Sequence, residues 1–308
     1  MTPEHPIGVF DSGVGGLTVL AEIRRELPAE DLLYVADSGH APYGDKSAAE
    51  IETRAVVLTE FLIGQGAKAV VVACNTATGA AARLLRTRYP VPIIAMEPAV
   101  KPAVTLTRSG VVGVMATRAT LASHKFRELL FQIGAGAEVL LQPCPGLVER
   151  VEVGDLDSDG TRALLSDYLR PLIERGVDNI VLGCTHYPYL RPLIEELAGP
   201  GVRVLDSGEA VARQVRRRLE SSGLLAPGGR RGMDRFWTSG PTEAAQDLVK
   251  RLWQAEVTLE PLPGGSGLQG SGCGVQGVGM HPAPRTLNPV PPAISPLVES
   301  YPAARVHW

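Results

Sequence analysis

The sequence predicts an α/β protein with two pseudo-symmetric lobes, each a mostly parallel sheet covered by helices. Short runs rich in Val, Ile and Leu alternate with longer stretches of helical periodicity, and part of this pattern recurs later in the chain. Continuous apolar strands between helices are typical of parallel sheets that are buried on both faces. The chain has 308 residues, 44% of them hydrophobic, which is enough for two lobes of about 100–150 residues each.

The apolar runs define eight expected strands and the periodic stretches between them define six expected helices. The strands are Ile7–Phe10, Leu32–Ala36, Ala69–Ala73, Pro92–Ala95, Val111–Met115, Glu138–Leu141, Asn179–Leu182 and Val202–Leu205. The helices are Leu17–Leu27, Ala48–Gly64, Thr78–Arg88, Leu121–Ile133, Thr161–Glu174 and Tyr189–Leu197.

An internal repeat relates the two halves of the chain. The segment VVVACNT, residues 70–76, resembles IVLGCTH, residues 180–186, so that Cys74 and Cys184 lie 110 positions apart. Two further strand pairs recur at offsets of 105 and 110. Open parallel sheets bind ligands beyond the carboxyl ends of their strands, where both cysteines stand. We therefore expect two lobes that face each other across a cleft, with the active site in that cleft.

The composition changes near the end of the chain. Residues 261–308 contain eight glycines and nine prolines, a content typical of disordered segments with little to bury. We predict a disordered tail there, in which Cys273 is an incidental thiol. The second lobe is expected in residues 99–207, and residues 1–98 are expected to begin the first.

Composition argues against several classes of protein and partner. The net charge of −3 gives no electrostatic reason to expect binding to nucleic acid or to an anionic membrane. No apolar run approaches the roughly 20 residues of a membrane span, and the polar start, residues 1–6, does not resemble a signal peptide. Four cysteines in a chain of this length do not form a disulfide scaffold. We expect a cytoplasmic protein with free thiols.

Neither a metal site nor a common catalytic motif is expected. Cys74, Cys144, Cys184 and His186 lack the paired close spacings of structural zinc sites. Neither a phosphate-binding P-loop nor the G-x-S-x-G motif of a serine hydrolase occurs in the sequence.

Cys74 and Cys184 are the candidate reactive groups. Each follows an apolar strand and precedes a polar pair and a helical pattern. Backbone N–H groups at a helix start favour an anion, so we expect the thiol pKa to fall from about 8.5 towards neutrality. A single free cysteine is more often a small buried hydrophobic residue. Two cysteines at matching positions of a repeat favour a chemical role.

Residues next to the cysteines provide hydrogen-bonding groups. Asn75 and Thr76 follow one cysteine, and Thr185 and His186 follow the other. Such groups are suitable ligands for a carboxylate or an ammonium group. His186 is placed to exchange a proton with the thiol of Cys184, although a lone histidine is more often structural.

Asp11 and Ser12 end the first strand and precede a glycine-rich turn, GVGG. This turn is not a dinucleotide fingerprint, because the third glycine of that pattern is replaced by Thr18. We expect a tight turn near a small ligand, with Asp11 either binding a substrate ammonium or orienting a thiol. Glu152 stands between two valines and is either a buried functional acid or one exposed position of a helix. The loop at residues 41–44 is either an ordinary turn or part of a site, and its spacing alone does not decide between the two interpretations.

Four motifs together carry a resemblance to a known family. They are FDSGVGGL at 10–17, PYG at 42–44, ACNT at 73–76 and GCTHYP at 183–188. In this order they strongly resemble the bacterial glutamate racemases of the aspartate/glutamate racemase superfamily. The resemblance runs from about Ile7 to Leu262 and does not include the tail.

The resemblance implies interconversion of L- and D-glutamate without pyridoxal phosphate or metal, supplying D-glutamate for peptidoglycan. Cys74 and Cys184 match the two acid/base thiols of the family, with Asp11, His186 and Glu152 assisting them. It further implies a homodimer and a return of residues 208–260 to the first lobe. The family's substrate-contacting positions correspond to Asp11, Ser12, Tyr43, Gly44, Asn75, Thr76, Thr117, Thr120, Thr185 and His186.

Inverting a stereocentre by deprotonation requires a base on one face of the carbon and an acid on the other. Two thiols from duplicated lobes suit this requirement. Three other functions stay open at this point. A related racemase or isomerase could act on aspartate, a hydantoin or maleate, a cysteine hydrolase could use Cys184 and His186 as a dyad, and a two-lobed binding protein would hold glutamate without converting it.

Overall fold

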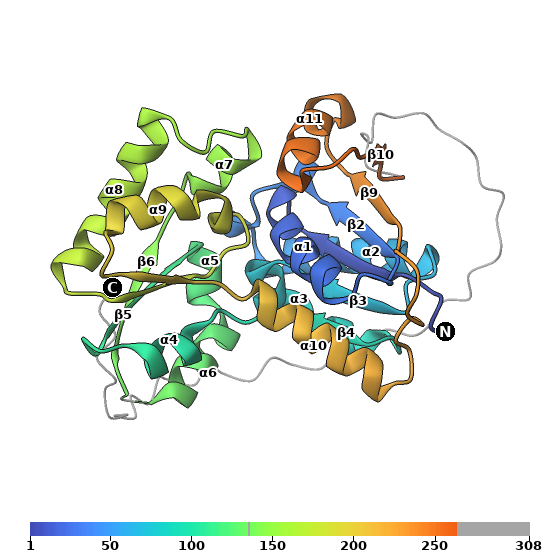
Figure 1. Ribbon diagram of the computed structural model, residues 1–308, viewed down its shortest axis with the longest axis horizontal. Coiled ribbons are helices and arrows are strands. Elements are labelled where there is room, and N and C mark those ends of the chain that lie inside the picture. Colours follow the sequence, from blue (N-terminus) through green and yellow to red (C-terminus); the bar gives the residue numbers. More distant parts are fainter. Residues whose placement is uncertain (135, 264–308) are drawn as a thin grey trace, which may run out of the picture.

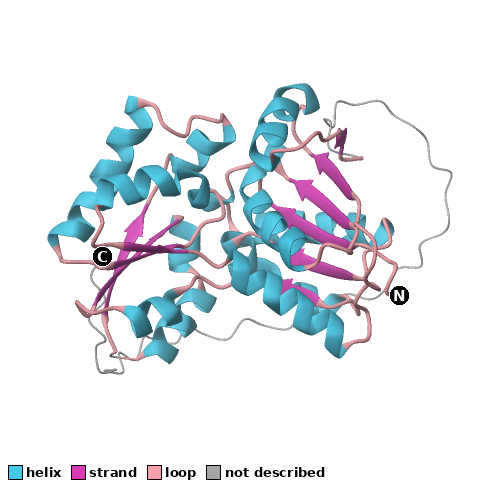
Figure 2. Ribbon diagram, viewed as in Figure 1, coloured by secondary structure: helices cyan, strands magenta, loops and turns pink. Residues whose placement is uncertain are grey.

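The computed structural model describes residues 1–134 and 136–263. The expected tail begins too early, because Pro261 ends a strand of the first lobe and Leu262 is buried, and the rest of that tail, from 264 onward, lies outside the described residues. Two α/β lobes lie side by side, each with one sheet between layers of helices (Figures 1 and 2). All strand pairs are parallel, which confirms the expected fold class. None of the described helices is both long and apolar enough to cross a membrane.

The first lobe is built on a six-stranded sheet in the order β10-β9-β2-β1-β3-β4. Its strands are β1 (Ile7–Asp11), β2 (Leu32–Ala36), β3 (Ala69–Val72), β4 (Ile93–Ala95), β9 (Asp234–Thr238) and β10 (Leu259–Pro261). Helices α1 (Leu17–Glu26), α10 (Gly208–Ser221) and α11 (Thr242–Trp253) cover one face; α2 (Ala48–Gly64) and α3 (Asn75–Arg88) cover the other. Side chains alternate between the faces, so Val9 joins the core beside α1 and Phe10 the core beside α2.

The second lobe is built on a four-stranded sheet in the order β6-β5-β7-β8. Its strands are β5 (Val111–Ala116), β6 (Glu138–Pro143), β7 (Asn179–Leu182) and β8 (Arg203–Leu205). Helices α7 (Leu147–Glu152), α8 (Asp159–Glu174) and α9 (Arg191–Ala198) share one core; α4 (Val100–Leu106) and α6 (His124–Ile133) share the other. Short elements at the strand ends are α5 (Arg118–Ala122) and the 3-10 helices Val14–Gly16, Ser38–His40, Tyr43–Asp45 and Tyr187–Leu190.

The repeat seen in the sequence appears as a repeated strand order. The run β2-β1-β3-β4 of the first sheet corresponds to β6-β5-β7-β8 of the second. Strands β9 and β10 extend only the first sheet, beside β2. The chain passes into the second lobe at residues 96–99 and returns at 206–207, where the Ser207 hydroxyl donates to the Glu97 carbonyl at 2.6 Å.

All eight expected strands are present, with small shifts at their ends, but the expected helix Leu121–Ile133 is two helices. Ser123 has an extended backbone, and its hydroxyl accepts from the Phe126 N–H at 3.1 Å to begin α6. Helix α3 begins three residues earlier than expected, because the Cys74 sulfur accepts from the Ala77 N–H at 3.4 Å. Strands β9 and β10 and helices α4, α7, α10 and α11 were absent from the expected set.

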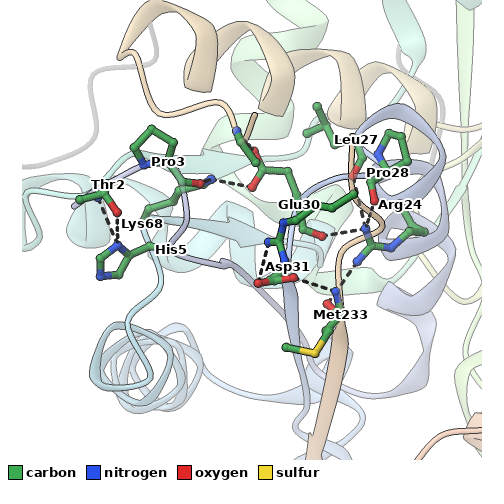
Figure 3. A network of polar contacts seen from close by, with 12 residues as sticks. Thr2, Pro3, His5, Arg24, Leu27, Pro28, Glu30, Asp31, Lys68 and Met233 are labelled. Atoms are coloured by element: carbon green, nitrogen blue, oxygen red, sulfur yellow. Dashed lines mark hydrogen bonds and ion pairs between the residues drawn. The ribbon is translucent and has the colours of Figure 1, made fainter. Parts of the chain in front are cut away.

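A buried ion pair lies at the amino ends of the strands, opposite the edge that carries the cysteines (Figure 3). Lys68 donates to Glu30 Oε2 and to the Pro3 carbonyl, each at 2.5 Å. The other oxygen of Glu30 accepts from the Ala226 N–H at 2.8 Å. Both side chains are almost fully buried. The pair therefore ties the N-terminal segment and the returning chain to the first sheet.

Candidate active site

The carboxyl ends of the two sheets face each other across a narrow cavity of about 10 Å³. That volume holds about one water molecule. Cys74 and Cys184 both line it, one from each lobe, and they are only 4% and 7% exposed. The cavity is lined by Ser12, Pro42, Tyr43, Gly44, Cys74, Asn75, Thr76, Thr117, Val148, Cys184, Thr185 and His186.

Cys74 stands at the start of α3, as the sequence predicted, but its ionisation differs from the expectation. Burial, and then the negative charge of Asp11, raise the pKa of the Cys74 thiol well above its usual value. Hydrogen bonding to the Ala77 N–H and to the Ser12 hydroxyl, 3.7 Å from the sulfur, opposes this shift. The N–H at the helix start acts in the expected direction, but the pKa does not fall towards neutrality, because desolvation of a buried thiolate outweighs one backbone N–H.

Asp11 ends β1 and is fully buried beneath the cavity lining. One carboxyl oxygen accepts from the N–H and hydroxyl of Ser12, at 2.5 and 3.0 Å. The other accepts from the Thr185 hydroxyl of the second lobe at 2.9 Å. Burial raises the pKa of Asp11, while His186 and these hydrogen bonds lower it. Asp11 thus orients residues beside both thiols rather than lining the cavity itself.

Cys184 is supported by a histidine and a carboxylate. Its sulfur lies 3.7 Å from His186 Nδ1, and His186 Nε2 lies 2.7 Å from Glu152 Oε1. Burial opposes protonation of the imidazole, but hydrogen bonds to Cys184 and Glu152 raise the pKa of His186 well above its usual value. Glu152 lies at the end of α7 and does not line the cavity. Its contact with His186 connects it to the site.

The first lobe also holds Glu152. The Val14 N–H donates to Oε1 at 2.7 Å, and the Ser38 hydroxyl donates to Oε2 at 3.1 Å. The glycine-rich turn allows this close approach. A Cβ atom on Gly13 would lie 1.9 Å from Glu152 Oε1, and one on Gly15 would lie 2.3 Å from His186 Nδ1. The expected tight turn thus packs against the Glu152–His186 pair of the opposite lobe.

Hydroxyl groups from both lobes meet at the cavity. The Thr76 hydroxyl lies 2.9 Å from that of Thr117 and 3.1 Å from that of Thr120. Thr120 contacts the lining through these two residues and does not line the cavity itself. Beside them, both polar atoms of the Asn75 amide are buried without a hydrogen-bond partner in the described part of the chain. This unpaired amide is available to a ligand.

Tyr43 and Gly44 form part of the wall, but the Tyr43 hydroxyl points to Asp37 Oδ2, at 2.5 Å. Arg54 donates to both oxygens of Asp37, at 2.9 and 2.8 Å. Burial opposes ionisation of Asp37, but the hydrogen bonds from Arg54 and Tyr43 lower its pKa overall. Sequence reasoning missed Asp37, Arg54 and Ser38 as supports of the site.

The lining contains neither lysine nor arginine, so a bound carboxylate would meet uncharged donors and His186. Among the residues that the structure describes, no group of three or more His, Cys, Asp or Glu side chains is arranged to hold a metal ion. The groups available for chemistry are two thiols, an imidazole and several hydrogen-bond donors. This set is suited to proton transfer on a small polar molecule.

Comparison with known proteins agrees with this chemistry. Residues 7–215 match the sequence model of the Asp/Glu/hydantoin racemase family. The chain is 56% identical to a glutamate racemase from Methylococcus capsulatus over 262 residues, covering 85% of this chain and 97% of that protein.

Solved structures give the same result. A glutamate racemase from Thermus thermophilus in complex with β-chloro-D-alanine has a TM-score of 0.72 and 38% identity, with 85% of this chain and 98% of that chain covered. The Escherichia coli glutamate racemase, in complex with L-glutamate and the activator UDP-MurNAc-Ala, has a TM-score of 0.74 and 33% identity, with 84% and 98% covered.

Proposed function

This chain belongs to the Asp/Glu/hydantoin racemase family, and from that premise we propose that it is a glutamate racemase that interconverts L- and D-glutamate by two-thiol proton transfer at Cα. The observation that carries the proposal is the presence of Cys74 and Cys184, from equivalent positions of the two lobes, on one narrow cavity. The names of the relatives favour glutamate over aspartate or a hydantoin.

The two thiols face groups of different charge. A protonated His186 stabilises negative charge on the adjacent Cys184 sulfur, whereas burial and Asp11 keep Cys74 as a thiol. In one direction the Cys184 thiolate takes the Cα proton of glutamate and the Cys74 thiol gives its own proton to the opposite face. The reaction leaves the charges of the two sulfurs exchanged, and the reverse reaction restores them.

The difficult step is forming the carbanion, because an α-carboxylate withdraws electrons poorly. Preorganised donors around the carboxylate would stabilise the charge that develops on it. The unpaired Asn75 amide, the Ser12 hydroxyl and the Thr76–Thr117 pair are the donors that line the cavity. They exist before a ligand binds, so little reorganisation is needed during the reaction.

The cavity is too small for glutamate in this arrangement, since it holds about one water molecule. The lobes must therefore separate to admit the substrate. Their closure would expel water and strengthen the interactions between donors and carboxylate.

In the cell we infer that the enzyme supplies D-glutamate for peptidoglycan synthesis in the cytoplasm, acting as a homodimer without a cofactor. The sequence motifs shared with the bacterial racemases support this inference. Sedimentation analysis of the purified protein tests the dimer directly.

The test is to incubate purified protein with L-glutamate in D₂O without added cofactor. We expect the circular dichroism of glutamate to decay to zero while NMR shows deuterium at Cα. L-Aspartate and a hydantoin, assayed in parallel, should react much more slowly. A hydrolase would give a cleaved product, and a binding protein would bind glutamate without changing its optical activity; either result contradicts the proposal.

Cysteine variants test the two-thiol step. Cys74→Ala and Cys184→Ala should each lower the rate by about 10³-fold or more, because each removes one of the two proton carriers. Cys144→Ala is the matched control, since Cys144 is equally buried but does not line the catalytic cavity. It should retain turnover. Full activity in either of the first two variants would rule out the mechanism.

A further inference from the structure

We propose that Ser38 is a positioning residue that holds Glu152 across the boundary between the lobes and so maintains the His186–Cys184 pair. This inference rests on the proposed racemase function. Ser38 follows β2 of the first lobe, whereas Glu152, His186 and Cys184 all belong to the second. The support of one thiol is therefore completed by a side chain from the opposite lobe.

The contacts of the carboxylate show what Ser38 contributes. Glu152 Oε1 accepts a hydrogen bond from the Val14 N–H and lies 2.7 Å from His186 Nε2. Within the described residues, Oε2 has the Ser38 hydroxyl as its hydrogen-bond donor, at 3.1 Å. Without that hydroxyl, the carboxylate is free to turn about its terminal bond and to loosen its contact with His186. Val14 contributes a backbone group that most residues could supply, but Ser38 contributes its side chain.

Ser38 is held firmly by its neighbours. The preceding residue, Asp37, is fixed by two hydrogen bonds from Arg54. The following residue, Gly39, donates its N–H to the Ser239 hydroxyl at 3.1 Å. Residues anchored on both sides lose little conformational freedom when they bind, so the hydroxyl is preorganised to hold Glu152.

The charges around His186 determine the consequence of losing Ser38. The groups that face its imidazole are Cys184 on its own segment, Glu152 from α7 and Asp11 from the end of β1. Glu152 stabilises the imidazolium, so a loosely held carboxylate lowers the pKa of His186. The protonated form then disappears at a lower pH, and proton transfer at Cys184 slows while transfer at Cys74 does not.

The first experiment compares pH profiles of racemisation for three variants. Ser38→Ala should lower kcat/KM by about tenfold or more, the effect of one hydrogen bond to a charged group, and should move the alkaline limb to lower pH. Ser38→Thr keeps a hydroxyl and should recover at least half of the activity. Ser239→Ala removes the anchor of Gly39 but keeps the Ser38 hydroxyl, so its loss of kcat/KM should be clearly smaller than that of Ser38→Ala.

The second experiment separates positioning from general damage to the loop. Primary isotope effects on kcat/KM are measured with α-deuterated L- and D-glutamate. In Ser38→Ala the effect should rise for the enantiomer that Cys184 deprotonates and fall for the other, because only the step at Cys184 has slowed. Unchanged isotope effects, or an equal loss of activity in Ser239→Ala, would overturn the role of Ser38. Wild-type protein that does not racemise glutamate would instead overturn the proposed function.

Discussion

The surroundings of Cys74 and Cys184 differ sharply although the two residues occupy equivalent positions of a duplicated sheet. Cys74 has a buried carboxyl group, Asp11, nearby and hydrogen bonds to a hydroxyl and a backbone N–H. Cys184 has an imidazole beside it and a carboxylate behind that imidazole. One sulfur thus lies near a carboxyl group, which raises its pKa, and the other lies beside an imidazole.

This difference shows that the duplication supplies symmetry of position without symmetry of charge. Racemisation needs two groups on opposite faces, but at any moment it also needs one base and one acid. In the mechanism that we propose, the unequal surroundings provide that inequality before the substrate arrives. The predictions that follow alter one side of this comparison at a time.

After the cysteine variants, the largest effect is expected from Gly15→Ala, which disturbs the Cys184 side without changing any ionisable group. The new methyl would lie 2.3 Å from His186 Nδ1, so the buried ring would have to shift and its contacts with Cys184 and Glu152 would change. We expect kcat/KM to fall about 100-fold or more and stability to fall by about 1–3 kcal/mol. Gly64→Ala is the control, because open space surrounds that position. Steady-state kinetics and urea unfolding measure both quantities, and a fully active Gly15→Ala enzyme would contradict the described contact.

Glu152→Gln should give the next largest effect, because it keeps the shape of the side chain and removes its charge. Glu152 raises the pKa of His186, so its neutral replacement lowers that pKa and the imidazolium is lost at lower pH. We expect kcat/KM to fall about 10- to 100-fold near pH 8 and its alkaline limb to move to lower pH. Glu149→Gln, at an exposed position of the same helix, should leave the pH profile in place. A limb that moves to higher pH would reverse our assignment.

Asp11→Asn tests the Cys74 side and should have a smaller effect. The charge of Asp11 adds to burial in raising the pKa of Cys74, so its removal should lower that pKa. The pH dependence of Cys74 alkylation, followed by peptide mass spectrometry, measures the shift. Asp45→Asn, at an exposed position, should leave the alkylation profile unchanged. If Asp11→Asn raises the pKa instead, the two thiol surroundings do not differ in the way described above.

The smallest effect is expected from ending the chain at Pro263. Every residue that we place in the site precedes this position, so turnover should stay within about twofold of the full-length protein. Ending the chain at Glu256 provides the contrast, because it removes strand β10 with the buried Leu259 and Leu262. That shorter protein should unfold at a clearly lower temperature. Loss of activity at Pro263 would assign a role to residues 264–308.

The fold was largely predictable where continuous apolar runs form central strands. Strand β9 was not, because its sequence DRFWT begins with two charged residues and follows a glycine-rich segment. Strand β10 ends at Pro261, inside the region whose composition predicts disorder. Strand β9 gains its structure by pairing with β2, which lies about 200 residues earlier in the chain, and β10 pairs with β9 in turn. Pairing between strands so far apart in the sequence leaves no local pattern from which a strand could be predicted.

The two thiols could be found from the repeat, since a duplicated motif marks equivalent strand ends. The roles of Asp37 and Ser38 could not, because their partners become neighbours only in the folded chain. Ser38 meets Glu152 across 114 positions of sequence. The raised pKa of Cys74 could not be predicted from the sequence either, because it depends on how far folding buries the sulfur away from water.

The bond between Ser207 and Glu97 fastens together the two stretches of chain that join the lobes. A hydrogen bond between the two connecting segments favours rotation of the lobes about one shared line over separate movement of each segment. The same rotation then controls the entry of the substrate, the exclusion of water from the cavity and the alignment of both sulfurs. Both enantiomers then enter by the same opening of the lobes. A molecule that binds the connecting segments and blocks this rotation would inhibit the reaction in both directions.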